Sequence, residues 1–87
     1  MSPEGWLIDP NRKWLLLFHR EPSDKKSFTN LYMDKWSMSS LGTPYSFKSR
    51  REVEINAAIE TWDELIGNGW KRIGSQFGEQ KTVLMQE

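Results

Sequence analysis

The stretch SRREVEINAAIETWDELIGNGW, residues 49–70, is the most clearly patterned part of this 87-residue chain. Ser49 followed by Glu52 matches a capping box, in which each residue satisfies a backbone amide at the start of a helix. The GNG at residues 67–69 tolerates positive φ and predicts the end of that helix. Between them, apolar residues recur at helical spacing: Ile55, Ala58, Ile59, Trp62, Leu65 and Ile66. The stretch therefore predicts one amphipathic helix, whose apolar stripe must pack on a surface from upstream.

The first third of the chain predicts that surface as a β-hairpin. Residues 5–8 and 13–20 have strand character, and Asp9 and Pro10 suit the first two positions of a type I turn. The second strand alternates so that one side carries Trp14, Leu16 and Phe18 and the other carries Leu15, Leu17 and His19. Both sides are apolar, although a two-layer domain normally leaves one sheet face to water. We expect this second face to meet the C-terminal segment, another subunit or a partner.

A third strand and an irregular arm are expected next. Residues 28–36 alternate as a strand does, and short connections favour an antiparallel meander. Residues 37–48 are rich in Ser, Gly and Pro, and we expect an irregular arm over the sheet edge. Its pinning side chains would be Met38, Leu41, Tyr45 and Phe47. After the helix, residues 69–73 predict a short strand or an anchored exit.

These elements predict an α+β fold: an antiparallel β-meander of three or four strands, with the amphipathic helix packed on one face. The stripe would pack on Trp14, Leu16 and Phe18. We expect a single β-β-β-α domain over residues 1–77 and a tail over residues 78–87. Termini fray by default, which favours a disordered tail, although the apolar residues 82–85 could also dock on the second sheet face.

The composition excludes several functional classes. The chain has no cysteine and one histidine, so a thiolate nucleophile, a thiolate metal site and a histidine metal cluster are excluded; we expect no metal and no cofactor. Twelve basic residues balance twelve acidic ones, so no bulk field favours nucleic acid or anionic lipid. The N-terminus lacks a secretion signal and no apolar run approaches the roughly 20 residues that span a bilayer, which predicts a cytoplasmic protein away from membranes.

Catalysis is not expected from these residues. His19 has no identifiable nucleophile or orienting carboxylate and is expected to have a structural hydrogen-bonding role. Asp63 and Glu64 are adjacent, so on a helix they point about 100° apart and cannot act as a dyad. We therefore predict no catalytic residue and a non-enzymatic protein.

Two binding sites are candidates. Lys48, Arg50 and Arg51 would lie beside the free amides of the helix N-terminus, which suits an anion or a partner. The simpler alternative is that Arg50 pairs with Glu54 one turn on. The second candidate is an interface with a partner or a second copy on the doubly apolar sheet, formed by Leu15, Leu17, Tyr32 and Trp36.

Nucleic-acid binding is the alternative function. Aromatic residues of the strands lie near basic ones and could form a stacking platform for a single strand: Trp14, Tyr32 and Trp36, with Arg12, Lys13, Arg20 and Lys35. The balanced net charge and the tendency of strand aromatics to be core residues favour a protein–protein interaction module instead.

The order of several short motifs resembles a known family. Gly5-Trp6-Leu7 opens the chain, Phe18-His19 ends the second strand, residues 48–51 read Lys-Ser-Arg-Arg, and Ala58 and Trp62 precede Gly69-Trp70. This pattern, over about residues 5–73, resembles a family of small marine-cyanobacterial proteins, the domain of unknown function 1651. The resemblance implies a cyanobacterial cytosol and brings no activity, cofactor or site. The apolar residues 15–17 and the tail beyond Phe77 depart from the pattern.

Overall fold

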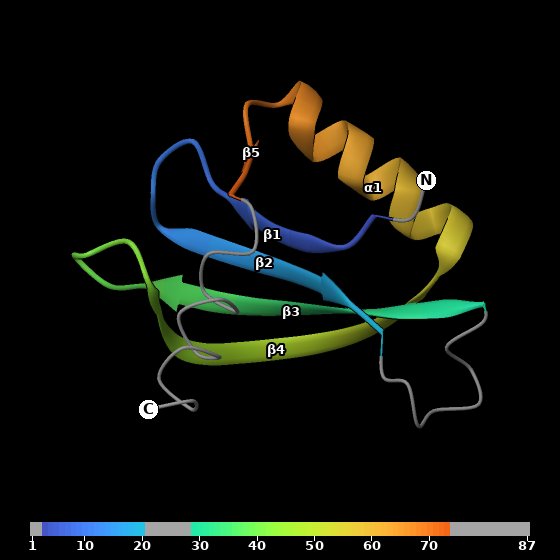
Figure 1. Cartoon of the computed structure of the whole chain (residues 1–87), viewed down its shortest axis with the longest axis horizontal. Coiled ribbons are helices and arrows are strands. Elements are labelled where there is room, and N and C mark those ends of the chain that lie inside the picture. The colour runs from blue at the N-terminus through green and yellow to red at the C-terminus, as the bar shows by residue number, and fades with distance from the viewer. Residues whose placement is uncertain (1–2, 21–28, 74–87) are drawn as a thin grey trace, which may run out of the picture.

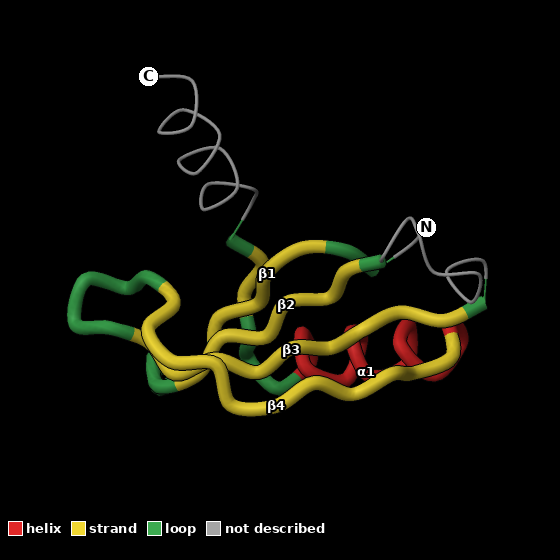
Figure 2. The backbone as a smooth tube through the Cα atoms, turned by 90° about the horizontal axis from the view of Figure 1, so that it is seen from below, coloured by secondary structure: helices red, strands yellow, loops and turns green. Residues whose placement is uncertain are grey.

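A computed structural model describes residues 3–20 and 29–73 of the chain. The strands form one antiparallel sheet in the order β4-β3-β2-β1-β5, and α1 packs across one face of it (Figures 1 and 2). The α+β class is confirmed, with five strands where three or four were predicted. In chain order the elements are β1 (Gly5–Ile8), β2 (Trp14–His19), β3 (Asn30–Met38), β4 (Pro44–Glu54), α1 (Ile55–Gly67) and β5 (Lys71–Arg72).

The β1–β2 hairpin closes through the predicted turn. The Arg12 N–H donates to the Asp9 carbonyl at 2.9 Å, which places Asp9 and Pro10 at the first two turn positions. The Asp9 side chain accepts from the N–H groups of Asn11 and Lys13 at 3.0 and 3.3 Å. This buried carboxylate therefore satisfies backbone donors that the turn leaves without a strand partner.

The predicted irregular arm over residues 37–48 is wrong. β3 runs on to Met38, and a loop over residues 39–43 returns the chain into β4. The Ser39 N–H donates to the Thr43 carbonyl at 2.8 Å, and the two side-chain hydroxyls lie 2.8 Å apart. Figure 2 shows the β3–β4 hairpin extending beyond the rest of the sheet. Most side chains of β4 are exposed. The sequence of β4 therefore lacks the alternation of apolar and polar residues that predicts a strand.

The predicted helix start is also wrong. Residues 49–54 belong to β4, and α1 begins at Ile55 with Glu54 as N-cap, whose carboxylate accepts from the Asn56 N–H at 2.9 Å. Pairing with β3 sets Val53 opposite Leu31 and packs it against the core. Because this ladder satisfies backbone groups along the whole stretch, it outweighs the one local cap that Ser49 could form.

The core lies between α1 and one face of the sheet. Its buried members are Leu7, Phe18, Leu31, Ala58 and Trp62, and the rings of Phe18 and Trp62 meet edge to face with centroids 5.0 Å apart. The predicted packing of the helix stripe on Phe18 and Leu16 is therefore confirmed. Trp14, predicted to be part of this contact, is not a member of the cluster; Lys35 Nζ lies 4.1 Å from the centroid of its ring. Ile66, predicted to be part of the apolar stripe, is 42% exposed.

The helix ends where predicted. Gly69 has φ +98°, the Trp70 N–H donates to the Leu65 carbonyl at 3.0 Å, and the Gly69 N–H donates to the Ile66 carbonyl at 3.1 Å. This is a Schellman ending, which needs a residue that accepts left-handed φ. The chain then pairs β5 antiparallel to β1, which confirms the short strand. The predicted tail, residues 78–87, lies outside the described residues.

Candidate functional site

The three predicted cations do not form one anion site. Lys48, Arg50 and Arg51 lie on β4, upstream of the helix, so the predicted site at the helix N-terminus is wrong. Arg51 is opposite Met33 and lies on the helix side of the sheet, whereas Arg50 is opposite Asp34 and lies on the other side. Lys48 falls at the bulge where the β3–β4 register shifts. The predicted pairing of Arg50 with Glu54 is likewise replaced by Asp34.

Arg50 joins an ionic cluster on the sheet face away from α1, which we call the second face. Its Nε and Nη2 donate to the two Asp34 carboxylate oxygens at 2.8 and 2.9 Å. His19 Nε2 lies 2.8 Å from Asp34 Oδ2, and the Tyr32 ring lies 4.9 Å from Arg50 Cζ. The cluster ties β2, β3 and β4 together. The hydrogen bond predicted for His19 is confirmed, and its partner is the carboxylate of Asp34, which the sequence alone did not identify.

The electrostatics of Asp34 follow from these contacts. The residue is 3% exposed, and burial by itself raises the pKa of a carboxyl group. The hydrogen bonds from Arg50 and His19, together with their charges, outweigh burial and hold the pKa of Asp34 below its ordinary value of 3.8. A carboxylate held ionised with both oxygens engaged is suited to bracing the sheet and poorly suited to accepting a proton in catalysis.

The four predicted interface residues share one face. The register sets Leu15 opposite Trp36, and Leu17 and Tyr32 lie at positions of the same parity, so all four are on the second face. Leu15 is fully buried, and the other three are half-buried. The alternation predicted for β2 is therefore confirmed; whether this face binds a partner stays a prediction.

The β3–β4 hairpin carries exposed apolar side chains that sequence reasoning had assigned to pinning an arm. Leu41 is 88% exposed, Tyr45 76% and Phe47 48%. Phe47 meets the Trp36 ring edge to face, with centroids 5.5 Å apart, which connects the hairpin to the second face. We call Leu41, Tyr45 and Phe47 the hairpin patch. The sequence signal that could have predicted this hairpin is the turn-like SLGTP, residues 40–44, between two runs of strand-forming residues.

The predicted nucleic-acid platform is divided between the two faces of the sheet. Tyr32 and Trp36 lie on the second face, whereas Trp14 and Lys35 lie on the helix side. Arg20 is drawn to Glu4, with its Nε 3.4 Å from Glu4 Oε2. These rings therefore do not form one continuous stacking surface.

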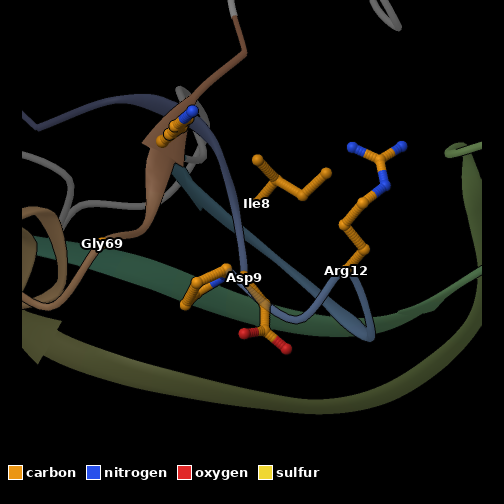
Figure 3. Close-up of a pocket in the computed structure, with 6 residues that line it drawn as sticks. Ile8, Asp9, Arg12 and Gly69 are labelled. Atoms are coloured by element: carbon orange, nitrogen blue, oxygen red, sulfur yellow. The ribbon is translucent and has the colours of Figure 1, made fainter.

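A shallow depression lies beside the β1–β2 turn (Figure 3). It has a volume of about 290 Å³, and Figure 3 shows the Asp9 and Arg12 side chains pointing apart on its wall. Arg12 has φ +56°, the one left-handed non-glycine residue among residues 3–20 and 29–73. Asp9 already accepts two backbone donors and points away from Arg12, so these two charged groups do not converge on a common point. Its residues are Ile8, Asp9, Pro10, Arg12, Gly69 and Lys71.

The strain at Arg12 gives a testable prediction. Arg12→Gly is expected to raise the free energy of unfolding by about 0.5–1 kcal/mol, because glycine adopts left-handed φ at little cost. Arg12→Ala is the control, since it removes the guanidinium and keeps the strain. Urea denaturation of both variants measures the effect. A glycine variant no more stable than the alanine variant would show that left-handed φ costs nothing here.

No group of three or more His, Asp or Glu side chains within residues 3–20 and 29–73 is placed to hold a metal ion. In the same part of the chain, no helix has the length and apolarity needed to cross a bilayer.

Comparison with known proteins identifies a family. The model of the family described as "Protein of unknown function (DUF1651)" matches residues 4–77. No curated protein and no solved structure matches the chain.

Proposed function

We propose that the chain, which belongs to the DUF1651 family of proteins of unknown function, is a non-enzymatic protein-binding module. The observation that carries the proposal is the hairpin patch. Three large apolar side chains at one end of the sheet are exposed by 48–88%. Exposed apolar groups gathered at one end of a small domain are typical of contact surfaces between proteins.

The chemistry of the patch also suits a protein partner. Tyrosine and phenylalanine are enriched at the centres of protein interfaces, where large side chains gain contact area at low entropic cost. Trp36 supports Phe47 from the neighbouring strand, so the Phe47 ring is already positioned before a partner binds. Phe47 lies opposite Trp36 in the β3–β4 ladder, Tyr45 lies on β4 at a register shift, and Leu41 lies in the loop that joins the two strands.

Nucleic-acid binding remains the second candidate. The observation that favours it is local: exposed Lys48 follows exposed Phe47 in the sequence of β4. Base stacking with phosphate neutralisation uses the same pair of groups. The division of the other predicted aromatics between two faces favours the protein partner.

Site-specific photo-crosslinking in native cells tests the proposal. A benzoylphenylalanine at Tyr45 is expected to give an adduct of defined mass, because the side chain there would lie inside the contact. The same probe at Ala57, an exposed position in the first turn of α1, is the matched control and should give none. Leu41→Ser should remove the Tyr45 adduct.

Each outcome has a distinct meaning. An adduct at Tyr45 that depends on Leu41 supports the binding module. Equal labelling at Tyr45 and Ala57, or an adduct indifferent to Leu41→Ser, contradicts it. An adduct that nuclease treatment removes, and that falls steeply with salt, would transfer the assignment to nucleic acid.

A cytoplasmic location and a cyanobacterial source remain predictions, and so does the absence of catalysis. The second face, with Leu15, Leu17, Tyr32 and Trp36, is proposed as a secondary contact area that adjoins the hairpin patch through Trp36.

A further inference from the structure

We infer that the partner of the hairpin patch is a second copy of this chain, and that the patch of one copy docks into a depression beside α1 of the next. This inference rests on the proposed function and names the occupant. It is carried by two features that the hairpin patch does not include: an apolar depression on the helix side, and a segregation of charge along the chain.

The depression lies between the N-terminal segment, α1 and β5. It has a volume of about 650 Å³ and an apolar floor of Ile59, Trp62 and Ile66. Glu4, Asp63 and Arg72 are its charged lining groups. Ile66 is 42% exposed, so an apolar group bound in this depression would bury apolar surface of Ile66 that is now in contact with water. The hairpin patch offers such groups in Leu41 and Tyr45.

Charge is segregated although the chain is neutral. Residues 35–51 contain four basic residues and no acidic one, whereas residues 52–70 contain five acidic residues and no basic one. Arg50 is paired with Asp34, so Lys35, Lys48 and Arg51 supply the positive charge of the first segment. The first segment contains the hairpin patch, and the second contains α1 with exposed Glu60, Asp63 and Glu64. Arg12 adds a further positive charge near the hairpin patch, because its guanidinium lies beside Gly42 in the loop between β3 and β4.

The two complementary surfaces lie at different ends of one molecule. In Figure 1 the β3–β4 hairpin extends away from α1, so the hairpin patch cannot reach the depression beside α1 of its own chain. Two copies can bring them together, and the basic residues of the hairpin segment would then lie near the acidic residues exposed on α1. Such a contact is heterologous, because different surfaces meet, and it leads to a ring or to an open chain of subunits.

Sedimentation velocity over a range of concentrations tests the inference. The wild type should show a mass that rises with concentration and falls with added salt, because the charged part of the contact is screened. A hairpin variant, Leu41→Ser with Tyr45→Ser, should remain a monomer. A depression variant, Ile66→Ser, should also remain a monomer. Both variants alter exposed side chains, so both should fold.

Mixing the two variants is the decisive step. The hairpin variant retains an intact depression and the depression variant retains an intact hairpin, so an equimolar mixture should form pairs and nothing larger. A wild type that stays monomeric to about 1 mM overturns self-assembly. A wild type that assembles while the mixture stays monomeric overturns this interface. If self-assembly fails and the Tyr45 adduct still depends on Leu41, the binding module stands with a different protein as its partner; if both fail, both are wrong.

Discussion

Trp62→Ala is expected to lower the free energy of unfolding by about 3–5 kcal/mol, the usual cost of removing a large buried aromatic side chain. Trp62 is 9% exposed and meets Phe18 edge to face, at an interplanar angle of 81°. This contact joins α1 to the central strand of the sheet. Small domains are stable by only about 5–15 kcal/mol, so the variant should be close to unfolded in water. Urea denaturation followed by circular dichroism measures the loss.

Ile66→Ala is the matched control for Trp62→Ala. It truncates an apolar residue of the same helix that is 42% exposed, so the expected loss is below about 1 kcal/mol. Equal losses for the two variants, or a Trp62→Ala variant as stable as wild type, would show that the helix does not pack on the sheet through Trp62.

Asp34→Asn is expected to cost about 2–3 kcal/mol at neutral pH, because it removes charge-assisted hydrogen bonds to a buried group. The Arg50 side chain is 45% exposed, so water can solvate it in the variant and limit the loss. Asp63→Asn, an exposed change of the same chemistry on α1, should change stability by less than about 0.5 kcal/mol.

The stabilisation from Asp34 should depend on pH. Its folded-state pKa lies below 3.8, so the ionised group stabilises the fold above that value. As the pH falls through the folded-state pKa, Asp34 becomes neutral and the difference in unfolding free energy between wild type and Asp34→Asn should shrink toward zero. A difference that stays constant from pH 7 to pH 2 would contradict the assigned ionic cluster.

The fold was predictable where a local pattern repeats. The helix stripe around Trp62, the turn at Asp9-Pro10 and the alternation of β2 each depend on residues close in sequence, and each is confirmed. β4 has no such pattern: it is an edge strand with Val53 as its one contributor to the core cluster. Ser49 and Glu52 then resembled a helix cap, and only the long-range pairing with β3 decides against it.

The predicted cation site at the helix N-terminus was wrong for the same reason. Arg50 and Asp34 are 16 residues apart, and their contact follows from the β3–β4 register, which cannot be derived before β4 is known. For the hairpin, the sequence identified Leu41, Tyr45 and Phe47 and treated apolar character as a sign of burial. Buried residues are mostly apolar, but an apolar residue need not be buried, because folded proteins also expose apolar side chains. Here the exposed ones form the hairpin patch.

The central claim is that the hairpin patch lies in solvent for binding and contributes little to the fold. The most direct measurement is the unfolding free energy of the Leu41→Ser, Tyr45→Ser variant, at a protein concentration low enough for the wild type to be a monomer. We predict a value within about 0.5 kcal/mol of wild type, as for surface substitutions elsewhere. A loss above about 2 kcal/mol would place these side chains in a core and contradict the claim.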